Sequence, residues 1–163
     1  MRKYSLLFLF VSFLFACSGD KADMPRLELD AIFLNGGEKD YSHDIEGILP
    51  LSQGDSIDVS FLLDGNGTDL KTFIVKNENK NIEVAIPFHP DEISDEFTTD
   101  EGVLWYKDGV RSASVVVRLT VRGGKEEEFG LSFYLNSKAP DCEAATYDLN
   151  LKTTTQPRDV YEE

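Results

Sequence analysis

From Pro25 onward, apolar and polar residues alternate along most of the chain with a period of two, which predicts β-strands rather than helices. Leu27, Leu29, Ala31 and Phe33, for example, form one apolar face in a run that the turn signal NGG ends. Pro87 places the fourth such segment at a sheet edge or a strand end. The predicted strands cover residues 27–33, 57–63, 70–76, 82–88, 102–107, 113–121, 129–135 and 147–151.

Strands with one apolar and one polar face require two sheets that pack face to face. With seven to eight such segments and almost no helical periodicity, we predict an all-β fold. The expected architecture is a two-sheet β-sandwich of immunoglobulin-like or related Greek-key type. The specific marks of immunoglobulin domains are missing, because no cysteine pair brackets Trp105 and residues 100–106 lack a tyrosine corner. The strand order therefore stays open.

The sixth and seventh segments are close enough in the chain to be interpreted as a hairpin. A three-residue loop, with Arg122 opposite Glu126, sets Leu119 against Phe129 and keeps the apolar residues together on the inner face. A two-residue loop would set Leu119 against Glu128, because a one-residue slip exchanges the two faces of a strand. We therefore predict the three-residue loop.

A different pattern occupies the start of the chain. Arg2 and Lys3 form a short basic head, and a run from Leu6 to Phe15 follows that is apolar except for Ser12. The run is about half the roughly 20 residues that a membrane-spanning helix needs. A basic head, a short apolar core and a small residue before the cut are typical of an export signal. We expect residues 1–16 to be a cleaved signal peptide.

The end of this leader, Leu14-Phe15-Ala16-Cys17, resembles the lipobox of bacterial lipoproteins. The resemblance implies that Cys17 becomes the first mature residue and is acylated with fatty acids such as palmitate. It also implies that the serine after Cys17 directs the protein to the outer membrane. An ordinary signal peptide with a chance cysteine is the alternative. The expected organisation is a lipidated tether over 17–24, a β-sandwich domain over 25–152 and a flexible C-terminal tail over 153–163.

The composition is acidic, with 16 Lys+Arg against 30 Asp+Glu and a net charge of −14. The leader contains two of the basic residues and none of the acidic ones, so the mature chain has 14 against 30 and a net charge of −16. Such a surface repels nucleic acid, which excludes DNA or RNA as a partner. It keeps the domain soluble and attracts cations or basic partners.

The chain has two cysteines. If Cys17 carries lipid, Cys142 has no intramolecular partner, and we expect it to be buried and inert, since a free cysteine packs like a small hydrophobic residue. A Cys17–Cys142 disulfide is the competing interpretation, and it requires the lipobox interpretation to be wrong.

Residues 64–69 have oxygen-bearing side chains at alternate positions, as at the start of a calcium loop. An EF-hand needs glycine at the sixth position and glutamate at the twelfth, where this chain has Asp69 and Val75. The loop is therefore not an EF-hand. A looser calcium site on Asp64, Asn66 and Asp69 is one interpretation, and a plain hairpin loop is the other.

Trp105, Tyr106 and Tyr134 are the aromatic residues that would suit a sugar-stacking surface. Period two places Trp105 and Tyr106 on opposite faces, and we expect Trp105 to be the core residue and Tyr134 to be exposed. Separately, Asp55-Ser56-Ile57 resembles the short O-glycosylation motif of exported proteins in some Gram-negative anaerobes. That resemblance makes Ser56 a candidate glycosylation site, against an ordinary strand start.

Candidates for catalytic chemistry are few. The chain has two histidines, no GxSxG motif and no protease signature around Cys142. The pairs Asp91/Glu92 and Asp100/Glu101 would suit glycoside hydrolysis only if folded about 5–10 Å apart. We expect a non-catalytic module without a cofactor, lipid-anchored at the outer membrane and contacting protein or glycan. The alternatives are a calcium-dependent adhesion or carbohydrate-binding module and a carboxylate-dependent hydrolase.

Overall fold

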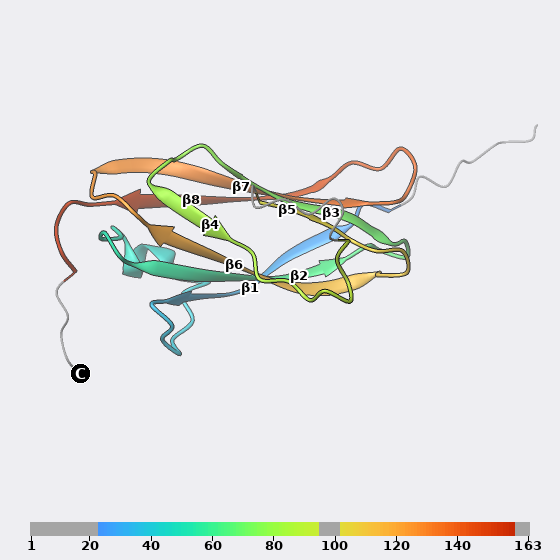
Figure 1. Ribbon diagram of the computed structural model, residues 1–163, viewed down its shortest axis with the longest axis horizontal. Coiled ribbons are helices and arrows are strands. Elements are labelled where there is room, and N and C mark those ends of the chain that lie inside the picture. Colours follow the sequence, from blue (N-terminus) through green and yellow to red (C-terminus); the bar gives the residue numbers. More distant parts are fainter. Residues whose placement is uncertain (1–22, 95–101, 159–163) are drawn as a thin grey trace, which may run out of the picture.

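Eight β-strands form two four-stranded sheets in the computed structural model, which describes residues 23–94 and 102–158 (Figure 1). A single 3-10 turn, η1 (Ile45–Ile48), lies between the first two strands. The sheets pack face to face, so the predicted all-β sandwich is confirmed. The strands are β1 (Arg26–Leu34), β2 (Ser56–Asp64), β3 (Leu70–Asn77), β4 (Ile82–Ala85), β5 (Val103–Trp105), β6 (Ser112–Val121), β7 (Glu127–Ser137) and β8 (Ala145–Thr153).

The strand order is immunoglobulin-like. Sheet A has the order β1-β2-β6-β4 and sheet B the order β5-β3-β7-β8, with every pair antiparallel. Immunoglobulin constant-type domains place strands A, B, E and D in one sheet and C, F and G in the other. Sheet A matches the first set, and β3, β7 and β8 match the second. β5 extends sheet B beside β3 but follows β4 in the chain, whereas the extra immunoglobulin strands of that sheet precede strand D.

The core lies between the two sheets, where the alternation places it. Apart from Phe129, which is only partly buried, the apolar residues predicted to face inward from β2 and β7 are at most 2% exposed. Removing one such side chain from water contributes about 1.5–3 kcal/mol to folding, so these central strands supply much of the stability. The inward-facing residues are Ile57, Val59, Phe61 and Leu63 of β2 and Leu131, Phe133 and Leu135 of β7.

β1 departs from the predicted alternation at a β-bulge. Leu29 pairs with Phe61 and Ala31 pairs with Ser60, so the register shifts by one residue at Asp30. A bulge inserts one residue and exchanges the faces of the strand beyond it. The core therefore receives Ile32, which is 1% exposed, and the predicted inward positions of Ala31 and Phe33 are wrong.

The predicted hairpin between the sixth and seventh segments does not form. β6 pairs with β2 and β4 in sheet A, and β7 pairs with β3 and β8 in sheet B, so the chain crosses from one sheet to the other. Leu119 consequently lies opposite β2 and β4 rather than Phe129, and Arg122 forms its ion pair with Glu83 rather than Glu126. Alternation fixes which side chains face inward, but the partner strand depends on long-range contacts that alternation does not encode.

The edge position predicted from Pro87 is confirmed, since β4 is an outer strand of sheet A and ends at Ala85. The C-terminal segment forms contacts with the rest of the domain. Thr153 is the last residue of β8 and 1% exposed, and Ser52 Oγ donates to the carbonyl of Gln156 (2.8 Å). Residues 153–158 of the predicted tail thus contact the sandwich, residues 159–163 lie outside the described part of the chain, and the flexibility of the tail stays a prediction.

Loops at one end of the sandwich are tied to the start of the domain, and we call this the N-terminal end (right in Figure 1). Asn66 Nδ2 of the β2–β3 loop donates to the carbonyl of Met24 (3.0 Å). Cys142 Sγ of the β7–β8 loop lies 3.5 Å from the carbonyl oxygen of Asp23. These two loops correspond to the B–C and F–G loops, which bind antigen in immunoglobulin variable domains. The described chain ends at the opposite end of the sandwich.

Candidate functional site

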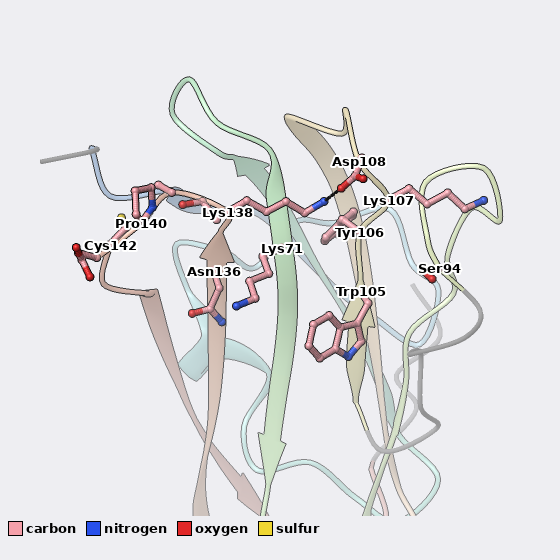
Figure 2. Close-up of a pocket in the computed structure, with 13 residues that line it drawn as sticks. Lys71, Ser94, Trp105, Tyr106, Lys107, Asp108, Asn136, Lys138, Pro140 and Cys142 are labelled. Carbon is pink, nitrogen blue, oxygen red and sulfur yellow. Dashed lines mark hydrogen bonds and ion pairs between the residues drawn. The ribbon is translucent and has the colours of Figure 1, made fainter. Parts of the chain in front are cut away.

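An open hollow of about 910 Å³ lies at the N-terminal end, on the outer face of sheet B (Figure 2). Residues of β3, β5 and β7 and of the loops that follow β5 and β7 line it. The hollow is thus built at the meeting point of three strands that are far apart in the sequence. Its lining includes Lys71, Trp105, Tyr106, Lys107, Asp108, Asn136, Lys138, Asp141 and Cys142.

β5 determines which aromatic ring is offered to this hollow. Leu104 and Tyr106 are 3% and 5% exposed and belong to the core, whereas Trp105 points to the outer face and is partly exposed. The prediction that Trp105 is the core residue is therefore wrong. The period of two was right, but both faces of this short strand are apolar, so the pattern did not say which one points inward. Burial, together with the nearby charge of Glu92, raises the pKa of Tyr106, which keeps its hydroxyl protonated.

Two polar side chains accompany Trp105 on the outer face. Thr72 of β3 lies between Trp105 on β5 and Asn136 on β7, and Asn136 Nδ2 donates to Thr72 Oγ1 (2.9 Å). A register shift between Leu70 and Thr72 leaves Lys71 without a partner residue in β7. In Figure 2 the Lys71 side chain extends toward Asn136, and the Trp105 indole lies on the other side of β3. Because adjacent strands are about 4.8 Å apart, the backbones of Trp105 and Asn136 are separated by roughly 10 Å.

The hollow is richer in cations than the chain as a whole. Three lysines and two aspartates line it, whereas the complete chain has 16 Lys+Arg against 30 Asp+Glu. Two of the ammonium groups are engaged within the protein: Lys107 Nζ donates to the carbonyl of Pro90 (2.7 Å), and Lys138 forms an ion pair with Asp108. Within the described residues, the ammonium group of Lys71 has no hydrogen bond or ion pair.

Tyr134 lies on the same outer face, as predicted, but not in the hollow. Ile74 of β3 pairs with both Val103 and Tyr134, which places Tyr134 two residues along from the row of Trp105 and Asn136. Combining the strand spacing with the rise per residue, the backbones of Trp105 and Tyr134 are about 12 Å apart. Lys76 Nζ lies 5.0 Å from the centre of the Tyr134 ring. Trp105 and Tyr134 therefore both contribute to the outer face of sheet B, and the hollow lies at the N-terminal end of that face.

The residues proposed for calcium are engaged in the hydrogen bonds of the loops. Asp64 Oδ1 accepts from the N–H of Asn66 (2.7 Å), and Asp69 Oδ2 accepts from the N–H of Gly109 (2.7 Å). Asp69 also lies 3.5 Å from Arg111 Nε. The Gly109 hydrogen bond, followed by the contributions of Arg111, lowers the pKa of Asp69. In residues 23–94 and 102–158, no three His, Cys, Asp or Glu side chains are grouped to hold a metal ion, and the calcium site stays a prediction.

We expect millimolar calcium to leave the Tm of the protein unchanged. Asp69 already has Gly109 and Arg111 as partners, so a cation would gain little differential affinity for the folded state. Thermal unfolding followed by circular dichroism, with calcium and with a chelator, measures this. A rise in Tm with calcium that the Asp64→Ala variant no longer shows would contradict the expectation.

The other predicted residues are not brought to the hollow, with the exception of Cys142. Ser56 begins β2 at the opposite end, where its N–H donates to Asn35 Oδ1 (2.8 Å), and its glycosylation stays a prediction. Cys142 is a partly exposed free thiol in the lining of the hollow, so the predicted burial is wrong. Cys17, with the rest of the lipobox, lies outside the described residues, as does the pair Asp100/Glu101. None of the described helices is long and apolar enough to cross a membrane.

Lys71 and Asn136 are two polar residues of the hollow that the sequence analysis did not single out. Lys71 lies near the start of the predicted strand 70–76, and Asn136 directly follows the predicted strand 129–135. Polar residues are common at both kinds of position in a β-sandwich, so neither residue indicates a site. They meet only because β3 and β7 are neighbours and because a bulge turns Lys71 out of the ladder. A correct strand order would have been the signal needed to find them.

Comparison with known proteins gives a family but no activity. No curated protein matches the chain. Among solved structures, it is similar to SSP-19, an MSP-domain protein like family member in Caenorhabditis elegans, with 19% identity, 64% of this chain and 92% of that chain covered, and a TM-score of 0.35. A similarity at this level carries no argument about function. A family model matches residues 17–153, most of the chain, which therefore belongs to the family described as Domain of unknown function (DUF5035).

Proposed function

We propose that the protein is a non-catalytic, lipid-anchored module at the outer membrane that binds saccharides in the hollow. One observation carries the proposal: a partly exposed indole, an ammonium group without a partner in the described residues and a side-chain amide converge there, from Trp105, Lys71 and Asn136. Sugar rings present an apolar C–H face and a hydroxyl edge. An aromatic surface flanked by a few hydrogen-bonding groups complements both.

The proposal leaves out catalysis because of where the carboxylates of the hollow lie. Asp108 is ion-paired with Lys138 and its side chain is 97% exposed, and Asp141 is exposed on the β7–β8 loop. A glycosidase needs two carboxyl groups that flank the bond to be cut, one of them held in an environment that raises its pKa. Exposed carboxylates on loops favour a binding role over a hydrolytic one.

The position of the hollow supports a role close to the membrane surface. Cys142, which lines the hollow, contacts the carbonyl oxygen of Asp23, and Asp23 follows Cys17 by six residues. An extended chain of this length spans at most about 22 Å. If Cys17 carries the lipid, the hollow is held near the bilayer that anchors it, where the saccharides of the envelope are concentrated.

The binding proposal is tested with the full chain purified in detergent and a panel of neutral and acidic oligosaccharides, using calorimetry. We expect Trp105→Ala to weaken the binding of any retained saccharide by about tenfold or more, since an aromatic contact with its buried area contributes on the order of 1.5 kcal/mol. Phe88→Ala removes an exposed aromatic ring outside the hollow and serves as the control. Equal affinities for the wild type and Trp105→Ala would refute binding in the hollow.

The anchoring proposal is tested separately by replacing Cys17 with serine. The hydroxyl cannot be acylated by the route that modifies the lipobox cysteine, so we expect the protein to move from the membrane fraction to the soluble fraction. Cell fractionation with immunodetection measures the distribution, and Cys142→Ser is the matched control that should stay with the membrane. Retention of the Cys17→Ser protein in the membrane fraction would count decisively against a lipid anchor.

A further inference from the structure

We infer that the saccharide bound in the hollow carries a carboxylate, as a uronic acid does, and that Lys71 with Asn136 selects it. The inference rests on the proposed function and adds the chemical class of the ligand. It assigns a role to two side chains that face the hollow from neighbouring strands, one cationic and one amide.

The charge of the hollow is the first argument. In a chain with nearly twice as many acidic as basic residues, three of the five charged residues in the lining are lysines. A cationic site on an acidic protein favours an anionic ligand there, while the rest of the surface repels it. A neutral saccharide would gain nothing from this local reversal of charge.

The hydrogen bonding of each lysine points to Lys71 as the selecting group. Lys107 donates to the carbonyl of Pro90 and Lys138 is paired with Asp108, so both already have partners. Lys71, by contrast, has none within the described residues and is exposed to solvent. Its ammonium group is therefore available to a ligand without first breaking an interaction.

Asn136 supplies a second donor at a suitable place. One of its amide hydrogens is used in the hydrogen bond to Thr72 Oγ1, which fixes the orientation of the side chain (2.9 Å). The amide has a second N–H, and the Lys71 side chain extends toward it (Figure 2). The two oxygens of one carboxylate can accept from both groups. The roughly 10 Å between the backbones of Asn136 and Trp105 then leaves room for a sugar ring to rest against the indole.

The test uses matched pairs of oligosaccharides, each pair consisting of a uronic acid oligomer and its neutral counterpart of the same linkage. Affinities are measured by calorimetry for the full chain in detergent, at low and high salt. We expect the acidic member of the bound pair to bind about tenfold or more tightly, and we expect this preference to shrink as salt screens the exposed charge. Lys71→Met should reduce the preference to less than about threefold, whereas Lys71→Arg should keep it.

Lys152→Met is the control, because Lys152 is also exposed on sheet B but lies away from the hollow. It should leave the preference for the acidic member unchanged. Equal binding of both members would overturn the inference while leaving the proposed function standing. A preference for the acidic member that survives in Lys71→Met would overturn the role of Lys71. If neither member of any pair binds, the proposed function fails and the inference fails with it.

Discussion

Replacing Phe61 with alanine is expected to lower the free energy of unfolding by about 3–5 kcal/mol. Phe61 projects from sheet A into the rings of sheet B and is fully buried. Its ring centre lies 4.7 Å from that of Phe133, 5.4 Å from that of Tyr147 and 5.9 Å from that of Phe73. Alanine leaves a cavity at this junction, and aromatic pairs of this kind add about 0.5–1.5 kcal/mol beyond the buried area. Urea unfolding followed by circular dichroism measures the loss.

Phe88→Ala is the matched control for this prediction. The side chain of Phe88 is 42% exposed, so its removal should change the free energy of unfolding by no more than about 0.5 kcal/mol. A small effect of Phe61→Ala, close to that of Phe88→Ala, would mean that the two sheets do not pack through this cluster of rings.

Asp55→Asn is expected to cost about 1–3 kcal/mol at neutral pH, with a cost that shrinks in acid. Asp55 is 6% exposed and accepts three hydrogen bonds, from Asn35 Nδ2 (2.9 Å), Ser52 N–H (2.8 Å) and Arg158 Nε (2.8 Å). An asparagine has only one acceptor oxygen, and its NH2 group would face hydrogen-bond donors, so some of these hydrogen bonds would be lost. The carboxylate thus joins the β1–β2 connection to the C-terminal segment.

The stability that Asp55 contributes depends on pH because its pKa is lowered in the folded protein. Burial raises the pKa of Asp55, but the hydrogen bonds from Asn35, Ser52 and Arg158 outweigh it and hold the pKa below its ordinary value. A carboxyl group with a lowered pKa in the folded state stabilises the fold above its unfolded pKa of about 3.9, and this stabilisation is lost as the pH falls through the folded-state pKa. Urea midpoints measured from neutral to acid pH should therefore converge for the wild type and Asp55→Asn.

Asp58→Asn makes the same chemical change three residues further along the chain, within β2, and serves as the control. Asp58 pairs with Arg118 on the exposed side of sheet A (2.7 Å), so screening by solvent should make its effect smaller than that of Asp55→Asn. A constant difference between the wild type and Asp55→Asn across the pH range would show that the ionised carboxylate is not what stabilises this junction.

The strands and most of their inward faces could be predicted from the sequence. Alternate residues of a half-buried strand face the core, so a period of two in the apolar residues indicates both the strand and its inward face. The prediction failed where an extra residue or a long-range contact decides the outcome. The bulge at Asp30 turns Ile32 toward the core, and no residue type near Asp30 predicts a bulge. The segments of β6 and β7 were interpreted as a hairpin, although the chain crosses from one sheet to the other between them. An alternating pattern indicates a strand but not the strand with which it pairs.

The candidate site was only partly predictable for the same reasons. Trp105 and Tyr134 were recognised as aromatic candidates, but the choice between Trp105 and Tyr106 for the core required the tertiary structure, since both have apolar neighbours. Lys71 and Asn136 lie 65 residues apart in the sequence and become a site only through strand order. The hollow forms only where three particular strands become neighbours, whereas a sequence pattern describes one strand at a time. The pattern therefore could not predict the hollow.

The fluorescence of Trp105 offers the most direct test that the hollow binds saccharides, because Trp105 is the single tryptophan of the chain. The full chain is titrated with the oligosaccharides of the panel, and the emission is compared with the binding isotherm from calorimetry. We predict a saturable change in emission whose midpoint equals the calorimetric Kd and which Phe88→Ala leaves intact. Binding detected by calorimetry with an unchanged emission, or the absence of binding by every member of the panel, would contradict the account.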